Sequence, residues 1–295
     1  MGQHALVLGA GGHAAIAWEL GVVTGMADAG IDVRDADLIV GTSAGARVGV
    51  QIRSDLGLED LFQQQVDPHL QTKEPAPPVD FMRWRADFVR AKEGSGDAAA
   101  VLKRFGNPAL KMPSDLQETR RNLIARALPS HTWPEGRLLI VAVDVEGGER
   151  RTFDGSSGVD LIDAVAASGA VPGIWPAVTL QGRRYMDGGM YSIDNADLAV
   201  GCDHVLILTL PARVPPLCVA SLDAAVDTLR RSGARVDVVH PDDASQAAFA
   251  SVGGNLLDPS VREAAARAGR EQGRRAYASS CTSLACSTTC LFARV

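Results

Sequence analysis

Short apolar runs alternate with longer helical patterns along most of this 295-residue chain. Runs typical of buried strands lie at 5–8, 37–40, 137–143, 204–208 and 236–239, with shorter strand-like stretches at 177–180 and 184–186. Helical patterns lie at 15–29, 43–54, 161–167 and 259–277. Strands that alternate with helices are typical of βαβ units. The pattern therefore predicts a three-layer α/β fold, with a mostly parallel central sheet flanked by helices.

The segment 56–134 interrupts this alternation. It contains the run Pro75-Ala76-Pro77-Pro78, and helical stretches are predicted at 80–90, 97–104 and 115–127. A structureless loop of this length is uncommon in a compact domain. We therefore expect a helical insertion or lid at 56–134, inside one α/β domain that spans 1–280.

The tail at 281–295 is rich in Ser, Thr and Cys, and we expect it to be disordered. Cys281, Cys286 and Cys290 lie in it without a fourth Cys or His nearby, so the sequence predicts no metal site.

Composition and charge exclude some classes of protein. The chain is 46% hydrophobic and 22% charged, which is typical of a globular protein. A net charge of -6 argues against nucleic acid as a partner, because such binders carry a basic face. No run approaches the roughly 18 apolar residues of a membrane span, and no signal peptide is visible. We expect a cytoplasmic location, with peripheral membrane contact and the oligomeric state left open.

The run Gly41-Thr42-Ser43-Ala44-Gly45 matches G-x-S-x-G, the sharp turn that exposes a nucleophilic serine between a strand and a helix. It follows the predicted strand 37–40 and opens the next helical pattern, whose N-terminus favours developing negative charge. Ser43 is therefore the predicted nucleophile. The alternative is a serine that simply caps the helix.

Gly9-Ala10-Gly11-Gly12 follows the first predicted strand and precedes the first helix. Consecutive glycines leave backbone N–H groups free to converge on an oxyanion, so we expect an oxyanion hole formed by Gly11, Gly12 and His13. The same loop also fits the dinucleotide fingerprint G-x-G-x-x-A, with Asp32 or Asp35 as its acid. Against this nucleotide-binding alternative, that acid belongs after a second strand, and 31–37 is instead typical of a turn before one.

Tyr185-Met186-Asp187-Gly188-Gly189 places a carboxylate on a glycine turn after a short strand. Such a carboxylate can reach a serine on another loop, take its proton and return it to a leaving group. Asp187 is therefore the predicted general base, and an ordinary Asp-Gly β-turn is the alternative.

In this order, the glycine loop with Gly9, the elbow with Gly41 and Gly45, and Asp187 with Gly188 and Gly189 resemble the patatin-like phospholipase family. Ala167-Ser168-Gly169-Ala170-Val171-Pro172-Gly173 is similar to the stretch that precedes the family's aspartate. The resemblance covers about 5–210, without the insertion.

This resemblance implies a Ser43–Asp187 dyad without a histidine. The dyad would cleave carboxylic esters of phospholipids or other acyl lipids through an acyl-enzyme, and no metal or cofactor is implied.

Two alternatives depart from this dyad. The family's glycine loop usually continues with a basic residue and a glycine, where this chain has Ala14 and Ala15. A lipid-binding or scaffold protein with an idle Ser43 is therefore one alternative.

The other is an α/β-hydrolase triad in the chain order Ser, Asp, His, with His204 or His240 as its third member. That fold normally has several strands before its elbow, and here only one strand besides the elbow's own precedes Gly41.

Overall fold

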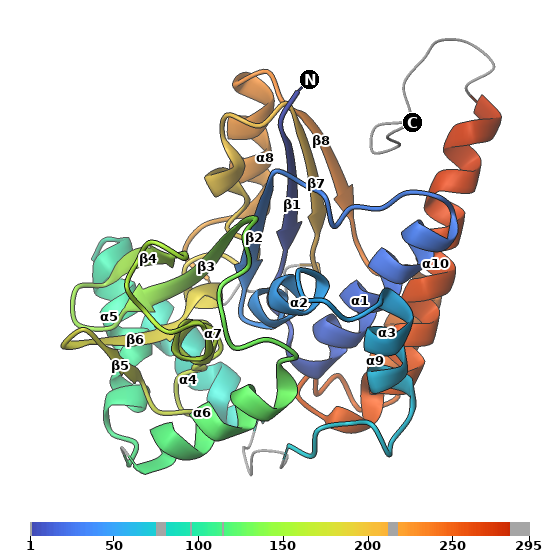
Figure 1. Cartoon of the computed structure of the whole chain (residues 1–295). Helices are drawn as coiled ribbons and strands as arrows, with labels where there is room; N and C mark the ends of the chain where they lie inside the picture. The colour runs from blue at the N-terminus through green and yellow to red at the C-terminus, as the bar shows by residue number, and fades with distance from the viewer. Residues whose placement is uncertain (1, 75–80, 95, 114, 212–217, 284–295) are drawn as a thin grey trace.

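The computed structural model describes residues 2–74, 81–94, 96–113, 115–211 and 218–283 (Figure 1). Its centre is a mixed, mostly parallel sheet. The strands are β1 (His4–Leu8), β2 (Leu38–Thr42), β3 (Arg137–Asp144), β4 (Glu149–Phe153), β5 (Val178–Leu180), β6 (Arg183–Asp187), β7 (His204–Leu208) and β8 (Arg235–Val239). Their order is β5-β6-β3-β2-β1-β7-β8, with β4 also paired to β3. The stretch β3-β2-β1-β7-β8 is parallel, whereas β4 and β6 run antiparallel to β3.

Helices cover both faces of this sheet, because successive side chains of a buried strand point to opposite faces. Leu6 and Leu8 of β1 pack into a core with α1 (Gly12–Asp28), α2 (Ala44–Ile52), α7 (Leu161–Ser168) and α10 (Arg262–Ser283). Ala5 and Val7 pack on the other face, against α8 (Leu222–Arg231) and the 3-10 helix η2 (Ala196–Ala199). The predicted three-layer α/β fold with a mostly parallel sheet is confirmed.

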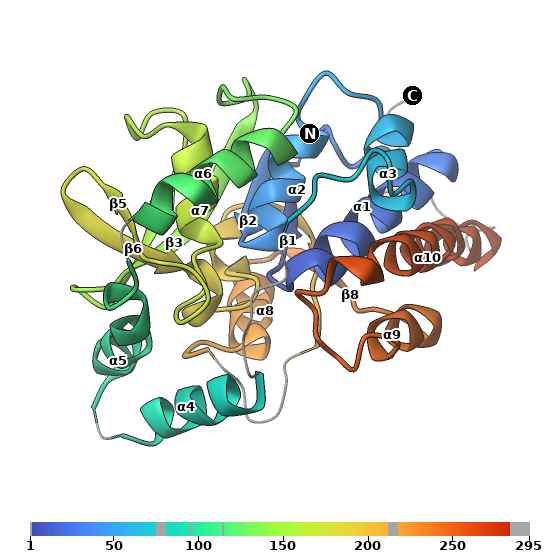
Figure 2. The same cartoon turned by 90° about the horizontal axis from the view of Figure 1, so that it is seen from below.

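The segment 56–134 contains α3 (Leu58–Val66), α4 (Phe81–Glu93), α5 (Ala98–Leu110) and α6 (Asp115–Ala127). The last three coincide with the helices predicted there, whereas α3 was not predicted. These helices do not form one separate body. Helix α3 packs on α1 and α10, α6 packs on α7, and α4 and α5 pack together. Figure 2 shows α4, α5 and α6 around one end of the sheet, away from α3.

Three further elements were not predicted from the sequence: β4, α8 and α9 (Asp243–Ala250). Strand β4 is a partly exposed edge strand with three charged residues, so it lacks an apolar run. Helices α8 and α9 are short, and most of their residues are exposed or partly so. The remaining 3-10 helices are η1 (Gly188–Met190) and η3 (Pro259–Val261).

The end of the chain differs in part from expectation. Helix α10 continues to Ser283, so residues 281–283 of the tail expected to be disordered are helical. The helical pattern predicted to end at 277 therefore continues for six more residues. The rest of that tail, with Cys286 and Cys290, lies outside the described residues.

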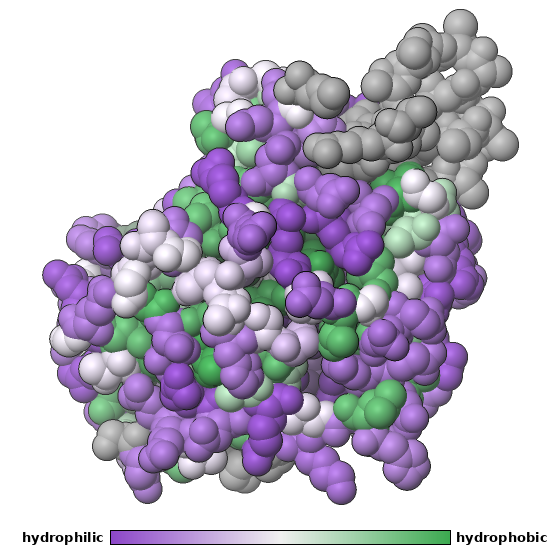
Figure 3. Space-filling view, viewed as in Figure 1, coloured by the Kyte–Doolittle hydropathy of each residue, from purple (hydrophilic) through white to green (hydrophobic). Residues whose placement is uncertain are grey.

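The described helices and surface bear on membrane contact. Within the described ranges, no helix combines the length and apolar character that crossing a bilayer requires. Figure 3 shows hydrophilic side chains over most of the face seen in Figure 1, with hydrophobic ones in separate patches between them. Leu70 and Val200 are large hydrophobic residues that are 54% and 51% exposed. Peripheral membrane contact stays a prediction from the sequence.

Candidate active site

Ser43 lies in a strained turn between β2 and α2. Its φ and ψ are 54° and -107°, a conformation that costs a non-glycine residue on the order of 1–3 kcal/mol. Ser168, at the end of α7, holds this turn in place. Its hydroxyl accepts a hydrogen bond from the backbone N–H of Ser43 at 2.8 Å and donates one to the carbonyl of Val141 at 2.6 Å. The serine is thus presented at the carboxyl edge of the parallel strands, where ligands bind in open α/β sheets.

Glycines allow the backbone segments of this site to approach closely. A Cβ on Gly45 would lie 2.1 Å from the carbonyl oxygen of Leu8, and one on Gly188 would lie 2.4 Å from that of Val141. The N–H of Gly45 donates to the carbonyl of Gly9 at 3.0 Å, which ties the elbow to the glycine loop. A Cβ on Gly41 would in turn meet the backbone of Ala46. The predicted motif glycines therefore fix how β1, β2, β3 and α2 meet.

The structure brings Ser43 and Asp187 together, although they are 144 residues apart. The hydroxyl of Ser43 donates to Oδ2 of Asp187 at 2.6 Å. The other carboxylate oxygen accepts a hydrogen bond from the N–H of Gly189 at 2.7 Å. Asp187 ends β6 and is only 2% exposed. Burial raises its pKa to about 6, against the opposing effects of the hydrogen bonds from Ser43 and Gly189 and of the positive charge of Arg120.

A buried asparagine links the two loops that carry these side chains. The amide nitrogen of Asn195 donates to the hydroxyl of Thr42 at 3.0 Å and to the carbonyl of Ser192 at 2.8 Å. It also lies 3.4 Å from the carbonyl oxygen of Gly188. Neither Asn195 nor Ser168 was predicted as a site residue. Ser168 lies in the stretch 167–173 that contributed to the resemblance, whereas no sequence signal pointed to Asn195.

The glycine loop places backbone N–H groups beside the serine. Those of Gly9, Ala10 and Ala14 donate to the carbonyls of Leu208, Ile193 and Leu256. Across the part of the chain that the structure describes, no recorded hydrogen bond occupies the N–H groups of Gly11, Gly12 and His13. These groups precede or begin α1, where the first N–H groups of a helix lack intrahelical partners. Gly11 and Gly12 line one cavity with Ser43 and Asp187, so the loop can present donors there.

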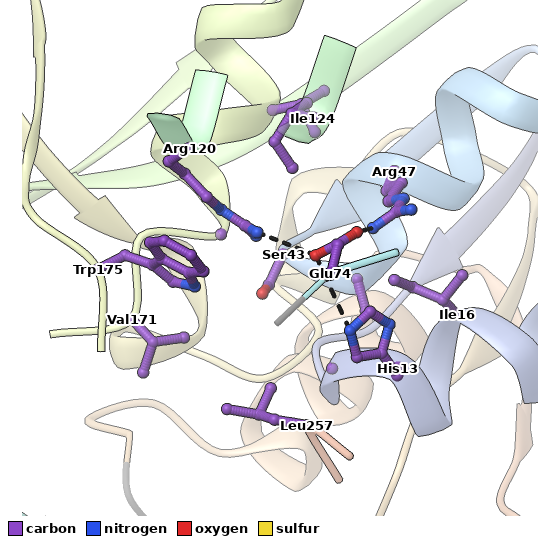
Figure 4. A pocket seen from close by; sticks show the side chains of 14 residues that line it. His13, Ile16, Ser43, Arg47, Glu74, Arg120, Ile124, Val171, Trp175 and Leu257 are labelled. Atoms are coloured by element: carbon purple, nitrogen blue, oxygen red, sulfur yellow. Dashed lines mark hydrogen bonds and ion pairs between the residues drawn. The ribbon is translucent and has the colours of Figure 1, made fainter. Parts of the chain in front are cut away.

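Two cavities border Ser43, and they differ in character. The larger has a volume of about 650 Å³ and is mainly apolar, with Trp84, Ile174, Met190, Leu210 and Leu256 among its lining residues. The smaller has a volume of about 60 Å³ and is lined by His13, Arg47, Glu74, Arg120 and Trp175, among others (Figure 4). Sequence patterns did not indicate Arg47, Glu74 or Arg120, because none of them belongs to a recognisable motif and the three lie in separate segments.

The histidines of the triad alternative lie elsewhere. His204 begins β7, at the opposite end of that strand from the site, and its ring stacks on His4 with centroids 5.1 Å apart. Nδ1 of His240 lies 3.0 Å from the carbonyl oxygen of Thr209. Neither histidine lines a cavity that borders Ser43. The Ser-Asp-His triad therefore lacks its geometry.

The acids of the nucleotide alternative are also misplaced. Asp32 and Asp35 precede β2 and so lie at the opposite end of this strand from Ser43 and the glycine loop. Asp32 pairs with Arg34 at 2.6 Å. The residue at the carboxyl end of β2, where a ribose-binding acid belongs, is Thr42. In the described ranges, no group of three or more His, Cys, Asp or Glu side chains is arranged to hold a metal ion.

One comparison with known proteins agrees with these motifs. The family model described as patatin-like phospholipase matches residues 6–200. A search of curated protein sequences finds no match. Solved structures similar to this one include VipD from Legionella pneumophila, with 14% identity and a TM-score of 0.40, covering 94% of this chain and 67% of VipD. Another is the type III effector protein ExoU, with 14% identity and a TM-score of 0.37. That match covers 93% of this chain, which spans about half (54%) of ExoU.

Proposed function

This chain belongs to the patatin-like phospholipase family, and from that premise we propose that it cleaves carboxylic esters of acyl lipids through an acyl-enzyme on Ser43. Family membership supports a lipid hydrolase in general. The observation that carries the finer proposal is the 2.6 Å hydrogen bond from the hydroxyl of Ser43 to the buried carboxylate of Asp187. A nucleophile needs a base within such reach of its proton.

In the first half of the proposed reaction, Oγ of Ser43 attacks the ester carbonyl carbon while Asp187 accepts the hydroxyl proton. The carbonyl oxygen becomes an oxyanion, held by the backbone N–H groups of Gly11, Gly12 and His13. The tetrahedral intermediate then collapses, and Asp187 gives its proton to the departing alcohol. The acyl group stays on Ser43.

In the second half, a water molecule gives a proton to Asp187 and attacks the acyl carbon. Collapse of this second intermediate returns the proton to Oγ of Ser43 and releases the fatty acid. The apolar cavity of about 650 Å³ falls in the range of small-molecule sites and suits the acyl chain.

The environment of Asp187 supports its role as the base. An exposed aspartate is a weak base, with a pKa near 3.9. Burial raises the pKa of Asp187 to about 6, so the carboxylate binds a proton more strongly and is still mostly ionised at pH 7. A histidine is then not needed to accept the serine proton.

The test is hydrolysis of p-nitrophenyl esters by Ser43→Ala and Asp187→Asn. Each variant is expected to lose at least about 10³-fold in kcat, because nucleophile and base act as a unit. Ser232→Ala and Asp223→Asn, at exposed positions of the same residue types, are matched controls that should keep full activity. Full activity in Ser43→Ala or Asp187→Asn would refute the proposal. A fluorophosphonate probe separates the scaffold alternative, since an idle serine would not be labelled.

A further inference from the structure

The small cavity beside Ser43 is lined by charged side chains that the proposed reaction does not use. Glu74 lies in its wall, between two arginines from distant segments (Figure 4). One carboxylate oxygen accepts a hydrogen bond from Nη1 of Arg47 in α2, and the other accepts one from Nη1 of Arg120 in α6, at 3.1 Å. The side chains of all three residues are at most 11% exposed. The three charges are therefore largely shielded from water, and charges interact more strongly where the effective dielectric constant is low.

Positive charge is in excess around this cavity. Among the described residues, three buried guanidinium groups, those of Arg47, Arg120 and Arg262, stand against the carboxylates of Glu74 and Asp187. Arg262 bonds to the side chain of a glutamine, Gln65, rather than to an acid. Burial, together with the positive charge of Arg47, lowers the pKa of Arg262 to about 10, against the opposing effect of Glu74. A buried charge that lacks a counter-charge is costly, so an additional anion would stabilise this region.

His13 does not add to this positive charge, nor does it remove it. Its Nε2 lies 3.8 Å from the carboxylate of Glu74. Burial nevertheless lowers its pKa to about 4, against the attraction of Glu74, so the imidazole is neutral at pH 7. The cavity thus presents its surplus charge through arginines, whose planar groups bind phosphate and carboxylate groups with two parallel hydrogen bonds.

Arg120 has donors left for such an anion. Its Nη1 binds Glu74 and its guanidinium lies over the ring of Trp175, 4.5 Å from the centroid. Within the described residues, no recorded hydrogen bond occupies its Nη2, and its buried Nε has no partner. Nη2 and the hydroxyl oxygen of Ser43 lie 3.5 and 3.9 Å from one shared point, the position that a Cβ on Gly169 would take. A group bound to Arg120 would therefore lie close to an ester that Ser43 attacks.

We propose that this cavity is an anion subsite, in which Arg120 and Arg47 bind a phosphate group of the substrate in exchange for the carboxylate of Glu74. The inference rests on the proposed hydrolysis at Ser43. The volume of about 60 Å³ corresponds to roughly four water-sized spaces, enough for one small tetrahedral anion. Glu74 holds the arginines in place until that anion arrives. In a glycerophospholipid the phosphate is a few bonds from an ester, which matches the short distance between Arg120 and Ser43.

Two soluble substrates with identical acyl chains test the subsite: dihexanoylglycerol and dihexanoylglycerol phosphate. Hydrolysis is measured at pH 8, where Asp187 is ionised. Arg120→Gln is expected to lower kcat/KM for the phosphate-bearing ester by about 10- to 100-fold, the effect of a lost charged hydrogen bond. The neutral ester should change by less than about threefold. Arg121→Gln is the matched control, because Arg121 follows Arg120 in the same helix but pairs with Asp160 and Asp163 outside the cavity.

An equal loss on both esters, or no loss on either, would overturn the subsite. An enzyme that cleaves neither ester and does not label at Ser43 would instead refute the proposed function, and the subsite with it. Inorganic phosphate distinguishes the two sources of the anion. If it competes with dihexanoylglycerol and Arg120→Gln removes this inhibition, the site also takes free phosphate. If it does not compete while the substrate preference holds, the site takes only the phosphate of the lipid.

If Arg120→Gln does not fold, Glu74→Gln provides an independent test. Without the competing carboxylate, KM for the phosphate-bearing ester is expected to fall about tenfold, with kcat for the neutral ester nearly unchanged. A KM that stays the same or rises would contradict the exchange of Glu74 for the substrate phosphate.

Discussion

The glycine-built side of the active site and the charged wall of Arg47, Glu74 and Arg120 both border Ser43, but they are constructed differently. On the glycine side, backbone meets backbone so closely that a single Cβ at Gly45 would overlap the carbonyl of Leu8. The charged wall instead consists of long side chains, and Arg120 comes from a helix of the inserted segment. The comparison indicates that the backbone sets the geometry of the proposed reaction, whereas the proposed substrate preference depends on side chains that can be exchanged without moving the backbone.

Gly45→Ala should have the largest effect on the folded state. Its Cβ would lie 2.1 Å from a backbone oxygen that cannot rotate away, so β1 and α2 must separate. We expect a loss of about 3 kcal/mol or more in the free energy of unfolding, measured by denaturant titration. Gly57→Ala is the control, because its φ is -63° and its Cβ would meet only the end of the Asp60 side chain. Similar unfolding midpoints for both variants would contradict the requirement for a glycine at position 45.

Ser168→Ala should have an intermediate effect, on activity more than on stability. It removes the acceptor of the Ser43 N–H and the donor to the Val141 carbonyl, which leaves buried groups unpaired at about 1–3 kcal/mol. We expect kcat to fall about tenfold and KM to stay nearly constant, since the serine is mispositioned while the cavities are intact. Ser232→Ala, at an exposed helix end, is the control. A change in KM alone would contradict a positioning role.

The smallest effect expected is on pH dependence. Asp187 must be ionised to accept a proton, and its pKa is about 6, so kcat/KM for a neutral ester should rise as pH increases through 6 and then level off. The charge of Arg120 lowers this pKa, so Arg120→Gln should move the rise to higher pH. A rate profile between pH 4.5 and 8 measures both. A profile of the unmodified enzyme that is flat from pH 5 to 7 would contradict the role of Asp187 as the base. A rise in Arg120→Gln that does not move to higher pH would contradict an effect of the charged wall on that base.

The difference between the two regions also explains what could be predicted. The elbow, the glycine loop and Asp187-Gly188-Gly189 are short motifs in which each residue type reflects a local backbone requirement, so the sequence displayed them directly. The buried strands could also be predicted, because each is a local run of apolar residues. Helix α3 and strand β4 carry weaker local signals and were missed. Asn195 and the charged wall contact residues that are far away in the sequence, so no local motif revealed them. Ser168 lies in a recognised stretch, but its hydrogen bonds to Ser43 and Val141 became visible only in the structure.

The sequence by itself determined the α/β class, the site-bearing turns and the candidates Ser43 and Asp187, because backbone conformation and burial are recorded in neighbouring residues. Only the tertiary structure decided that these two side chains touch, that burial raises the pKa of Asp187 to about 6, and that Arg47, Glu74 and Arg120 meet beside them. Those outcomes depend on strand order and on how the inserted helices pack. The distances between these side chains and their shielding from water depend on segments that are far apart in the sequence, and no local pattern connects such segments.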